Sequence, residues 1–180
     1  MTSCNSDLDA AIRRVPDFPR PGILFYDVTG ILMNPRVFRY CVERLAVRAK
    51  EAGAGAIAAI EARGFIFAAP VAERCGLPLV LVRKKGKLPG ETVSRGFALE
   101  YGEDSIEVQK ADLATPAHIL IIDDLIATGG TLSAAAAIFR ESGFSIAGIA
   151  AVIGLPFLNF RDALPGIPIH TLIDYHGEET

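Results

Sequence analysis

The sequence predicts one α/β domain of the doubly wound type, in which helices flank a mostly parallel sheet. Helical periodicity separates several apolar runs, which is typical of alternating strands and helices. With 180 residues, 51% of them hydrophobic, the chain can bury a core without disulfides or structural metal. The apolar runs lack polar alternation, as expected of parallel strands buried on both faces, and they are Ala56–Ile60, Leu79–Val82, Ile119–Ile122 and Ile146–Ile153.

A small N-terminal hood of residues 1–34 is predicted to precede a core of residues 35–180. Ser6 and Asp9 have the spacing of a capping box, which predicts a short helix that Pro16 ends. Its apolar face would carry Leu8, Ala11, Ile12 and Val15.

A long helix is predicted after the short apolar run Ile23–Val28. Asn34 suits the N-cap position and Pro35 the first helical turn. Gly53 suits the glycine position that follows a helix C-terminus. The apolar positions with helical spacing are Val37, Phe38, Cys41, Val42, Leu45, Ala46 and Ala49.

The segment Glu91–Gln109 has a different pattern, because its apolar residues alternate with polar ones on either side of Gly102. This alternation predicts an antiparallel hairpin that projects from the parallel sheet.

The strongest motif is Ile119–Thr131, in which a buried strand leads through two carboxylates and a small-residue turn into a helix. Gly129 and Gly130 let the main chain approach a phosphate closely, and the helix N-terminus adds N–H donors and partial positive charge. Thr128 and Thr131 add hydroxyl groups. The turn is therefore a predicted phosphate site.

Asp123 and Asp124 leave the carboxyl end of the same strand, which is the edge where open α/β sheets bind ligands. Carboxylates there suit a ribose diol or a phosphate-bound Mg²⁺, so the motif predicts a ribose 5-phosphate site. The alternative is that the aspartates only cap a turn. A Walker sequence is absent, and Gly53-Ala54-Gly55 precedes a strand, so neither common nucleotide motif is indicated.

Two further segments follow strands and carry cations. Arg63 lies in the turn Glu61–Phe65 and would point into the same crevice. A glycine-containing loop after the next strand suits a pyrophosphate, although a solvated loop or a nucleic-acid patch is the alternative. Its cations are Arg83, Lys84, Lys85 and Lys87.

The remaining candidates are weaker. Glu100 in the hairpin could serve as a general acid or base, or be a surface residue. Phe25, beside Tyr26, could stack on a planar ring or pack in the core. The histidines and cysteines form no metal-ligand spacing or nucleophile triad.

The overall charge and apolar content exclude several classes of protein. A net charge of −3 argues against extended nucleic-acid binding. Every apolar run is far shorter than the roughly 20 residues needed to span a bilayer. The N-terminus does not resemble a secretory signal, and we expect a cytoplasmic protein.

Taken together, these motifs resemble the type I phosphoribosyltransferase family, from about Pro16 to Ile153, and above all its members that act on adenine. The resemblance implies that Asp123 and Asp124 bind the ribose hydroxyls of phosphoribosyl pyrophosphate. It also implies that Ala127–Thr131 binds the 5-phosphate.

Further residue roles follow only from this resemblance. The pyrophosphate loop would be Glu61–Phe65, with a cis bond between Glu61 and Ala62, and the flexible catalytic loop Arg83–Thr92. The groups expected to stabilise the departing pyrophosphate are Arg63, Lys84 and Lys87, with Arg83 also binding substrate.

The base side would lie in Pro21–Thr29, with Phe25 against the ring and main-chain groups around Leu24 and Tyr26 reading adenine. Tyr26 departs from the family, since many relatives carry Arg or Lys there. Glu100 would assist proton transfer at the base.

The implied reaction is purine salvage, in which adenine displaces pyrophosphate from phosphoribosyl pyrophosphate to give AMP. It implies Mg²⁺ carried by the substrate near Asp123 and Asp124, and a homodimer. Two alternatives stay open: transfer to hypoxanthine, guanine or xanthine, and a regulator that senses phosphoribosyl pyrophosphate while binding nucleic acid.

Overall fold

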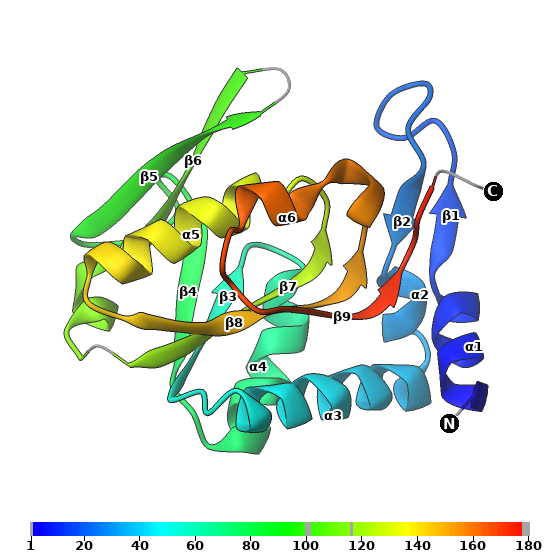
Figure 1. The fold of residues 1–180 in the computed structure, drawn as a ribbon, viewed down its shortest axis with the longest axis horizontal. Helices are drawn as coiled ribbons and strands as arrows, with labels where there is room; N and C mark the ends of the chain where they lie inside the picture. Colours follow the sequence, from blue (N-terminus) through cyan, green and yellow to red (C-terminus); the bar gives the residue numbers. More distant parts are fainter. Residues whose placement is uncertain (1, 100–101, 116, 178–180) are drawn as a thin grey trace.

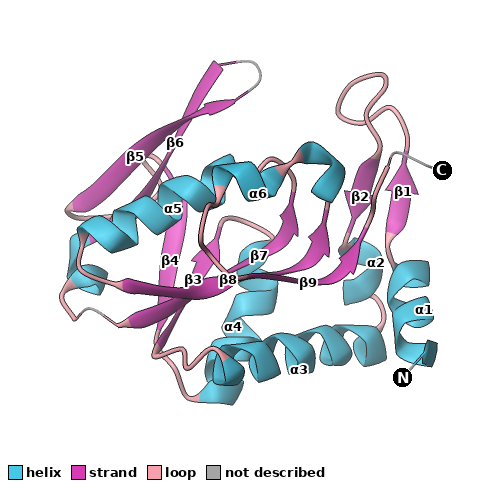
Figure 2. Ribbon diagram, viewed as in Figure 1, coloured by secondary structure: helices cyan, strands magenta, loops and turns pink. Residues whose placement is uncertain are grey.

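The computed structural model describes residues 2–99, 102–115 and 117–177. Within these residues the main sheet has seven strands in the order β5-β6-β4-β3-β7-β8-β9. Five neighbours in it run parallel, namely β3 (Ala56–Ile60), β4 (Leu79–Lys84), β7 (His118–Ile126), β8 (Ser145–Gly154) and β9 (Ile169–Asp174). The predicted doubly wound fold with a mostly parallel sheet is confirmed (Figure 2).

Helices cover both faces of this sheet (Figure 1). On one face lie α3 (Pro35–Glu51) and α4 (Gly64–Cys75), and on the other lie α5 (Gly130–Glu141) and the short α6 (Phe160–Ala163). Each face has its own buried cluster, the first around Leu45 and Phe67 and the second around Phe139. Each large side chain in these clusters contributes about 1.5–3 kcal/mol through burial.

The start and end of α3 follow the sequence prediction. The Asn34 side chain accepts hydrogen bonds from the N–H groups of Arg36 and Val37 at 3.2 and 3.3 Å, while Pro35 opens the helix. Gly53 has a φ of 63°, the left-handed conformation that favours glycine after a helix. The predicted apolar face is buried except at Phe38, which is partly buried.

The N-terminal helix prediction is wrong at both ends. α1 spans Thr2–Ala11, so Ser6 lies inside it and does not cap it. Arg13–Val15 form β1 instead of helix, because they pair antiparallel with β2 (Phe25–Asp27), and Val15 is 38% exposed. Leu8 and Ile12 are buried as expected, and α2 (Thr29–Leu32) leads into α3.

The predicted hairpin is formed by β5 (Thr92–Leu99) and β6 (Gly102–Gln109), which pair antiparallel. Its base continues the main sheet, because Glu107 of β6 pairs with Arg83 at the end of β4. Only its far end stands clear of the other elements (Figure 1). Short 3-10 turns occupy Lys110–Leu113 and Pro156–Leu158.

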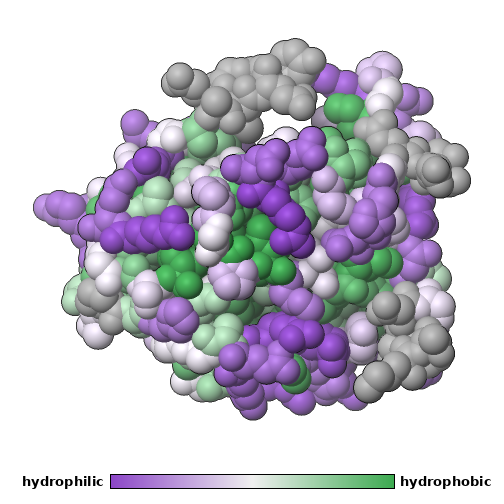
Figure 3. All heavy atoms as spheres, viewed as in Figure 1, coloured by the Kyte–Doolittle hydropathy of each residue, from purple (hydrophilic) through white to green (hydrophobic). Residues whose placement is uncertain are grey.

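The surface in Figure 3 mixes hydrophilic and hydrophobic residues. Large exposed apolar side chains include Phe18 and Met33. In the described part of the chain, no helix combines the length and apolar character needed to cross a bilayer.

We predict that Asn34→Ala lowers the free energy of unfolding by about 1 kcal/mol, because two N–H groups at the start of α3 lose their acceptor. Chemical denaturation would measure the loss. Asn34→Asp keeps the acceptor and is the matched control. Equal stability of all three proteins would show that the cap contributes nothing.

Candidate functional site

A cavity of about 420 Å³ opens at the carboxyl ends of β3, β4 and β7, next to the β5–β6 hairpin. It joins four segments that are separate in the sequence. Its polar lining comes from Glu61, Arg63, Lys84, Asp104, Asp123, Asp124 and Thr131, and its apolar lining includes Phe97 and Ala127.

The predicted phosphate turn lies between β7 and α5. Gly129 precedes the helix with a φ of 83°, and a Cβ there would lie 3.0 Å from the Phe160 carbonyl oxygen, so glycine is required on both counts. Gly130 opens the 12-residue helix α5. The first N–H groups of a helix have no partner within it, so this turn presents donors beside Ala127 and Thr131 of the cavity wall.

Asp123 and Asp124 lie within β7, which continues to Ile126, and not after its end as the sequence indicated. Asp124 is only 4% exposed and forms an ion pair with Arg63. Its N–H donates to Asp123 Oδ1 at 2.8 Å. Burial, followed by the neighbouring negative charge of Asp124, raises the pKa of Asp123 well above its ordinary value.

The turn between β3 and α4 packs directly against this aspartate pair. The Glu61–Ala62 peptide bond is cis, as the family resemblance implied. A Cβ on Gly64 would lie 2.9 Å from Asp123 Oδ1 and 3.1 Å from Asp123 Cα, so the turn can approach β7 only with glycine. This close approach of the turn to β7 allows Arg63 to form its ion pair with Asp124.

The four loop cations are in different environments. Arg83 donates to both carboxylate oxygens of Glu61, at 3.0 and 3.2 Å, and Lys84 Nζ lies 3.0 Å from Asp104 Oδ2. Lys84, Lys85 and Lys87 are all exposed, and Lys84 also lines the cavity.

The base-side residues are near the cavity but outside its described lining. Leu24 and Phe25 are half-buried, and the Arg63 guanidinium carbon lies 5.5 Å from the centre of the Phe25 ring. The Tyr26 side chain is 2% exposed and stacks on Tyr175 at 4.3 Å. Its hydroxyl donates to the Gly177 carbonyl at 3.2 Å, so this side chain belongs to the core and only its main chain is left for a ligand.

Two acidic residues of β6 were missed by the sequence analysis. Asp104 lines the cavity, and the buried Glu107 bonds to the loop after β4. Their positions depend on how the hairpin pairs with β4, which one sequence does not reveal. The alternation of Ile106, Glu107 and Val108 indicated only that the apolar pair shares one face of the strand, and it gave no sign that Glu107 is buried as well. Glu100 lies outside the described residues.

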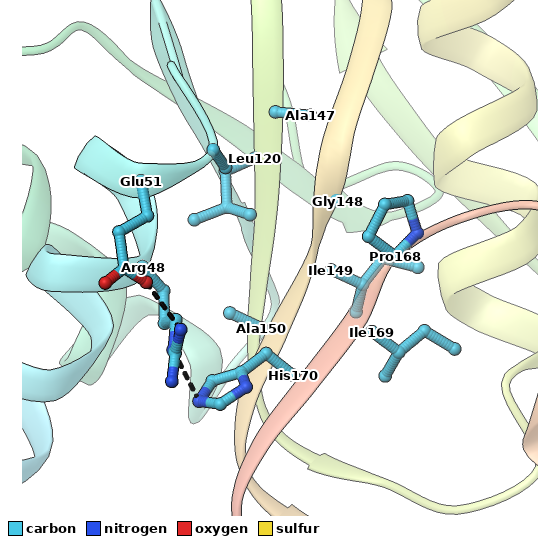
Figure 4. Close-up of a pocket in the computed structure, with 11 residues that line it drawn as sticks. Arg48, Glu51, Leu120, Ala147, Gly148, Ile149, Ala150, Pro168, Ile169 and His170 are labelled. Carbon is cyan, nitrogen blue, oxygen red and sulfur yellow. Dashed lines mark hydrogen bonds and ion pairs between the residues drawn. The ribbon is translucent and has the colours of Figure 1, made fainter.

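A second cavity, of about 350 Å³, lies between α3 and the β8–β9 edge (Figure 4). Its described lining shares no residue with the predicted site. Arg48 Nε donates to His170 Nε2 at 2.8 Å. Burial and then the charge of Arg48 lower the pKa of His170, which suits a neutral acceptor ring.

Comparison with known proteins is consistent with this geometry. The family model for the phosphoribosyl transferase domain matches residues 36–159. The adenine phosphoribosyltransferase of Treponema denticola is 57% identical over 172 residues, covering 96% of this chain and 90% of that protein.

Solved structures are similar along nearly the whole chain. Adenine phosphoribosyltransferase from Thermoanaerobacter pseudethanolicus has a TM-score of 0.91 and 42% identity, with 95% of this chain and 99% of that chain covered. The Saccharomyces cerevisiae enzyme, complexed with an imino-altritol bisphosphate and adenine, has a TM-score of 0.90 and 34% identity, with 96% and 100% covered.

We predict that Asp123→Asn leaves the ligand-free protein at least as stable as the wild type at neutral pH. The folded-state pKa of Asp123 is raised above the unfolded value of 3.8, so wild-type stability falls as pH rises through the interval between them. The amide does not titrate and removes this loss, while its oxygen can still accept from Asp124 N–H.

Thermal unfolding at a series of pH values would measure the effect, with Asp162→Asn on the exposed surface as control. A clearly less stable Asp123→Asn protein near pH 7 would contradict the prediction.

Proposed function

Because the chain belongs to the adenine phosphoribosyltransferase family, we propose that it transfers the phosphoribosyl group of phosphoribosyl pyrophosphate to N9 of adenine. The products are AMP and pyrophosphate, and the activity is a step of purine salvage. The observation that carries the proposal is the cavity that joins a phosphate turn, a carboxylate pair and two cations.

The sugar phosphate binds at the end of β7. Main-chain N–H groups of Ala127–Thr131 and the hydroxyls of Thr128 and Thr131 receive the 5-phosphate. Asp123 and Asp124 accept hydrogen bonds from the ribose hydroxyls. Asp124 is buried, and burial together with the charge of Asp124 raises the pKa of its neighbour Asp123, so hydroxyl donors that stabilise these carboxylates favour binding.

The leaving pyrophosphate binds on the opposite side of the cavity. Negative charge accumulates on it as the bond to C1′ breaks, and Arg63, Arg83, Lys84 and Lys87 supply positive charge there. Arg63 and Lys84 line the cavity, which supports this assignment. The loop Arg83–Thr92 would help to keep water from the activated sugar.

Asp123 and Asp124 would hold Mg²⁺ that the substrate carries. Among the described residues no three His, Cys, Asp or Glu side chains gather as a metal site. Mg²⁺ commonly uses one or two carboxylates together with substrate phosphates, and Asp123 and Asp124 fit that role. When bound, Mg²⁺ neutralises charge on the pyrophosphate.

The base binds between Phe25 and the hairpin. Phe25 packs on the ring, main-chain groups of Leu24 and Tyr26 read its edge, and Glu100 assists proton transfer. The contact between Arg63 and the Phe25 ring supports this arrangement, because it joins the base side to the diphosphate side.

We further propose that the protein acts in the cytoplasm as a homodimer, with residues 1–34 as a hood over residues 35–180. Light scattering after gel filtration would measure the mass in solution. A monomer that retains full turnover would contradict the dimer.

We predict AMP and pyrophosphate when the protein, Mg²⁺ and phosphoribosyl pyrophosphate are mixed with adenine. Hypoxanthine, guanine and xanthine are tested in parallel, with chromatography of the products. Formation of another nucleotide would show that the substrate is a different purine base. Absence of product with every base would contradict the activity and favour a sensor, which binding to DNA or RNA would then test.

We predict that Asp124→Asn and Lys87→Ala each lower kcat/KM for phosphoribosyl pyrophosphate by roughly tenfold or more, because each loses a charged contact to the ligand. Steady-state kinetics and thermal unfolding would be measured together. Lys110→Ala, which removes an exposed lysine paired with Glu91, is the control. Parallel losses of stability and activity would indicate a structural role.

A further inference from the structure

Glu107 is a buried carboxylate whose hydrogen bonds go to the cationic loop. It is 4% exposed and lies in β6. Its Oε1 accepts from the N–H groups of Lys87 at 3.0 Å and Leu88 at 2.9 Å, and its Oε2 accepts from the Thr92 hydroxyl at 3.2 Å. Since burying an unsatisfied carboxylate is costly, the carboxylate and the loop stabilise each other.

A second carboxylate holds the start of the same loop. Glu61 accepts from the Arg83 guanidinium and, at 3.0 Å, from the Lys84 N–H. Arg83 also donates to the Lys87 carbonyl at 2.9 Å. The main chain at Lys87 is therefore held on both sides, its N–H by Glu107 and its carbonyl by Arg83.

These contacts bear on how strongly the loop can bind an anion. A lysine-rich loop that is free in solution loses conformational entropy when a ligand orders it, and a loop already fixed loses less. Hydrogen bonds from Leu88 N–H, and also from Lys87 N–H, hold the pKa of Glu107 below its ordinary value, so it stays ionised at neutral pH.

We propose that Glu107 is a positioning residue for the diphosphate of the substrate: it fixes the turn Lys84–Leu88 beside the cavity before the ligand binds. This inference rests on the proposed function. Glu107 does not line the cavity within the described residues, so its effect is transmitted through the main chain of Lys87 and Leu88.

The contact geometry provides a conservative variant. Both N–H donors use Oε1, which Glu107→Gln retains, and its amide nitrogen can donate to the Thr92 hydroxyl where Oε2 now accepts. Glu107→Ala removes all three contacts. Glu141→Ala is the matched control, because Glu141 pairs with Arg95 of the same hairpin but away from the turn.

The experiment compares these three variants with wild type in the full chain with Mg²⁺. Affinity for phosphoribosyl pyrophosphate is measured by calorimetry, KM for both substrates by kinetics, and amide hydrogen exchange without ligand. For Glu107→Ala we expect about tenfold weaker binding of phosphoribosyl pyrophosphate and about tenfold faster exchange at Lys87 and Leu88. KM for adenine should change less than about twofold, and Glu107→Gln should restore most of the binding and protection.

Three results would overturn the inference. The first is faster exchange with unchanged binding of phosphoribosyl pyrophosphate. The second is a proportional loss of affinity for both substrates together with a lower Tm, which indicates a structural role. The third is a Glu107→Gln variant that behaves like Glu107→Ala. If wild type makes no nucleotide, the proposed function fails, yet calorimetry and exchange still decide whether Glu107 orders the turn.

Discussion

The ion pair between Arg63 and Asp124 is the contact on which the arrangement of the site depends. It joins the turn after β3 to the end of β7, two segments 61 residues apart in the chain. Asp124 is almost fully buried, and a buried carboxylate without a partner would strongly destabilise the fold or remain protonated. The ion pair therefore neutralises a carboxylate on the sugar side of the site, Asp124, with a cation from the diphosphate side, Arg63.

This arrangement has an electrostatic consequence for the free protein. Arg63 compensates the charge of Asp124. Burial and the neighbouring charge of Asp124 raise the pKa of Asp123, so the free site disfavours a second ionised carboxylate. Ligand binding therefore stabilises the two carboxylates, since hydroxyl donors and a metal ion both favour the ionised form. Such destabilised polar groups are common where binding energy is used for function.

The sequence predicted those parts of the fold that have strong local patterns. α3 combines a capping side chain, a helical apolar face and a terminal glycine, and the strand Ala56–Ile60 was placed at its observed ends. Arg13–Val15 was misassigned because three residues continue a helical pattern equally well, and only pairing with β2 decides between helix and strand. β9 was not predicted at all, since its sequence mixes apolar and polar residues without a strand pattern and only its pairing with β8 identifies it as a strand.

The candidate site was predictable to a similar extent. The sequence order of β7, the turn and α5 indicated the phosphate turn and both aspartates, because those groups are adjacent in the chain. Glu107 and Asp104 could not be assigned in this way, since their partners Lys87 and Lys84 lie 20 residues away across a strand pairing. Tyr26 illustrates the same limit, because its partner Tyr175 is close to the other end of the described chain.

Gly64 restricts how this site can change through mutation. Every replacement adds a Cβ, and that atom would meet Asp123 and the carbonyl oxygen of Ile122 at 3.1 Å or less. The turn could then no longer approach β7, and Arg63 would move away from Asp124. In evolutionary terms, a substitution of Gly64 preserves the site only if a second substitution at the end of β7 makes room for the added Cβ. The two positions are therefore expected to change together.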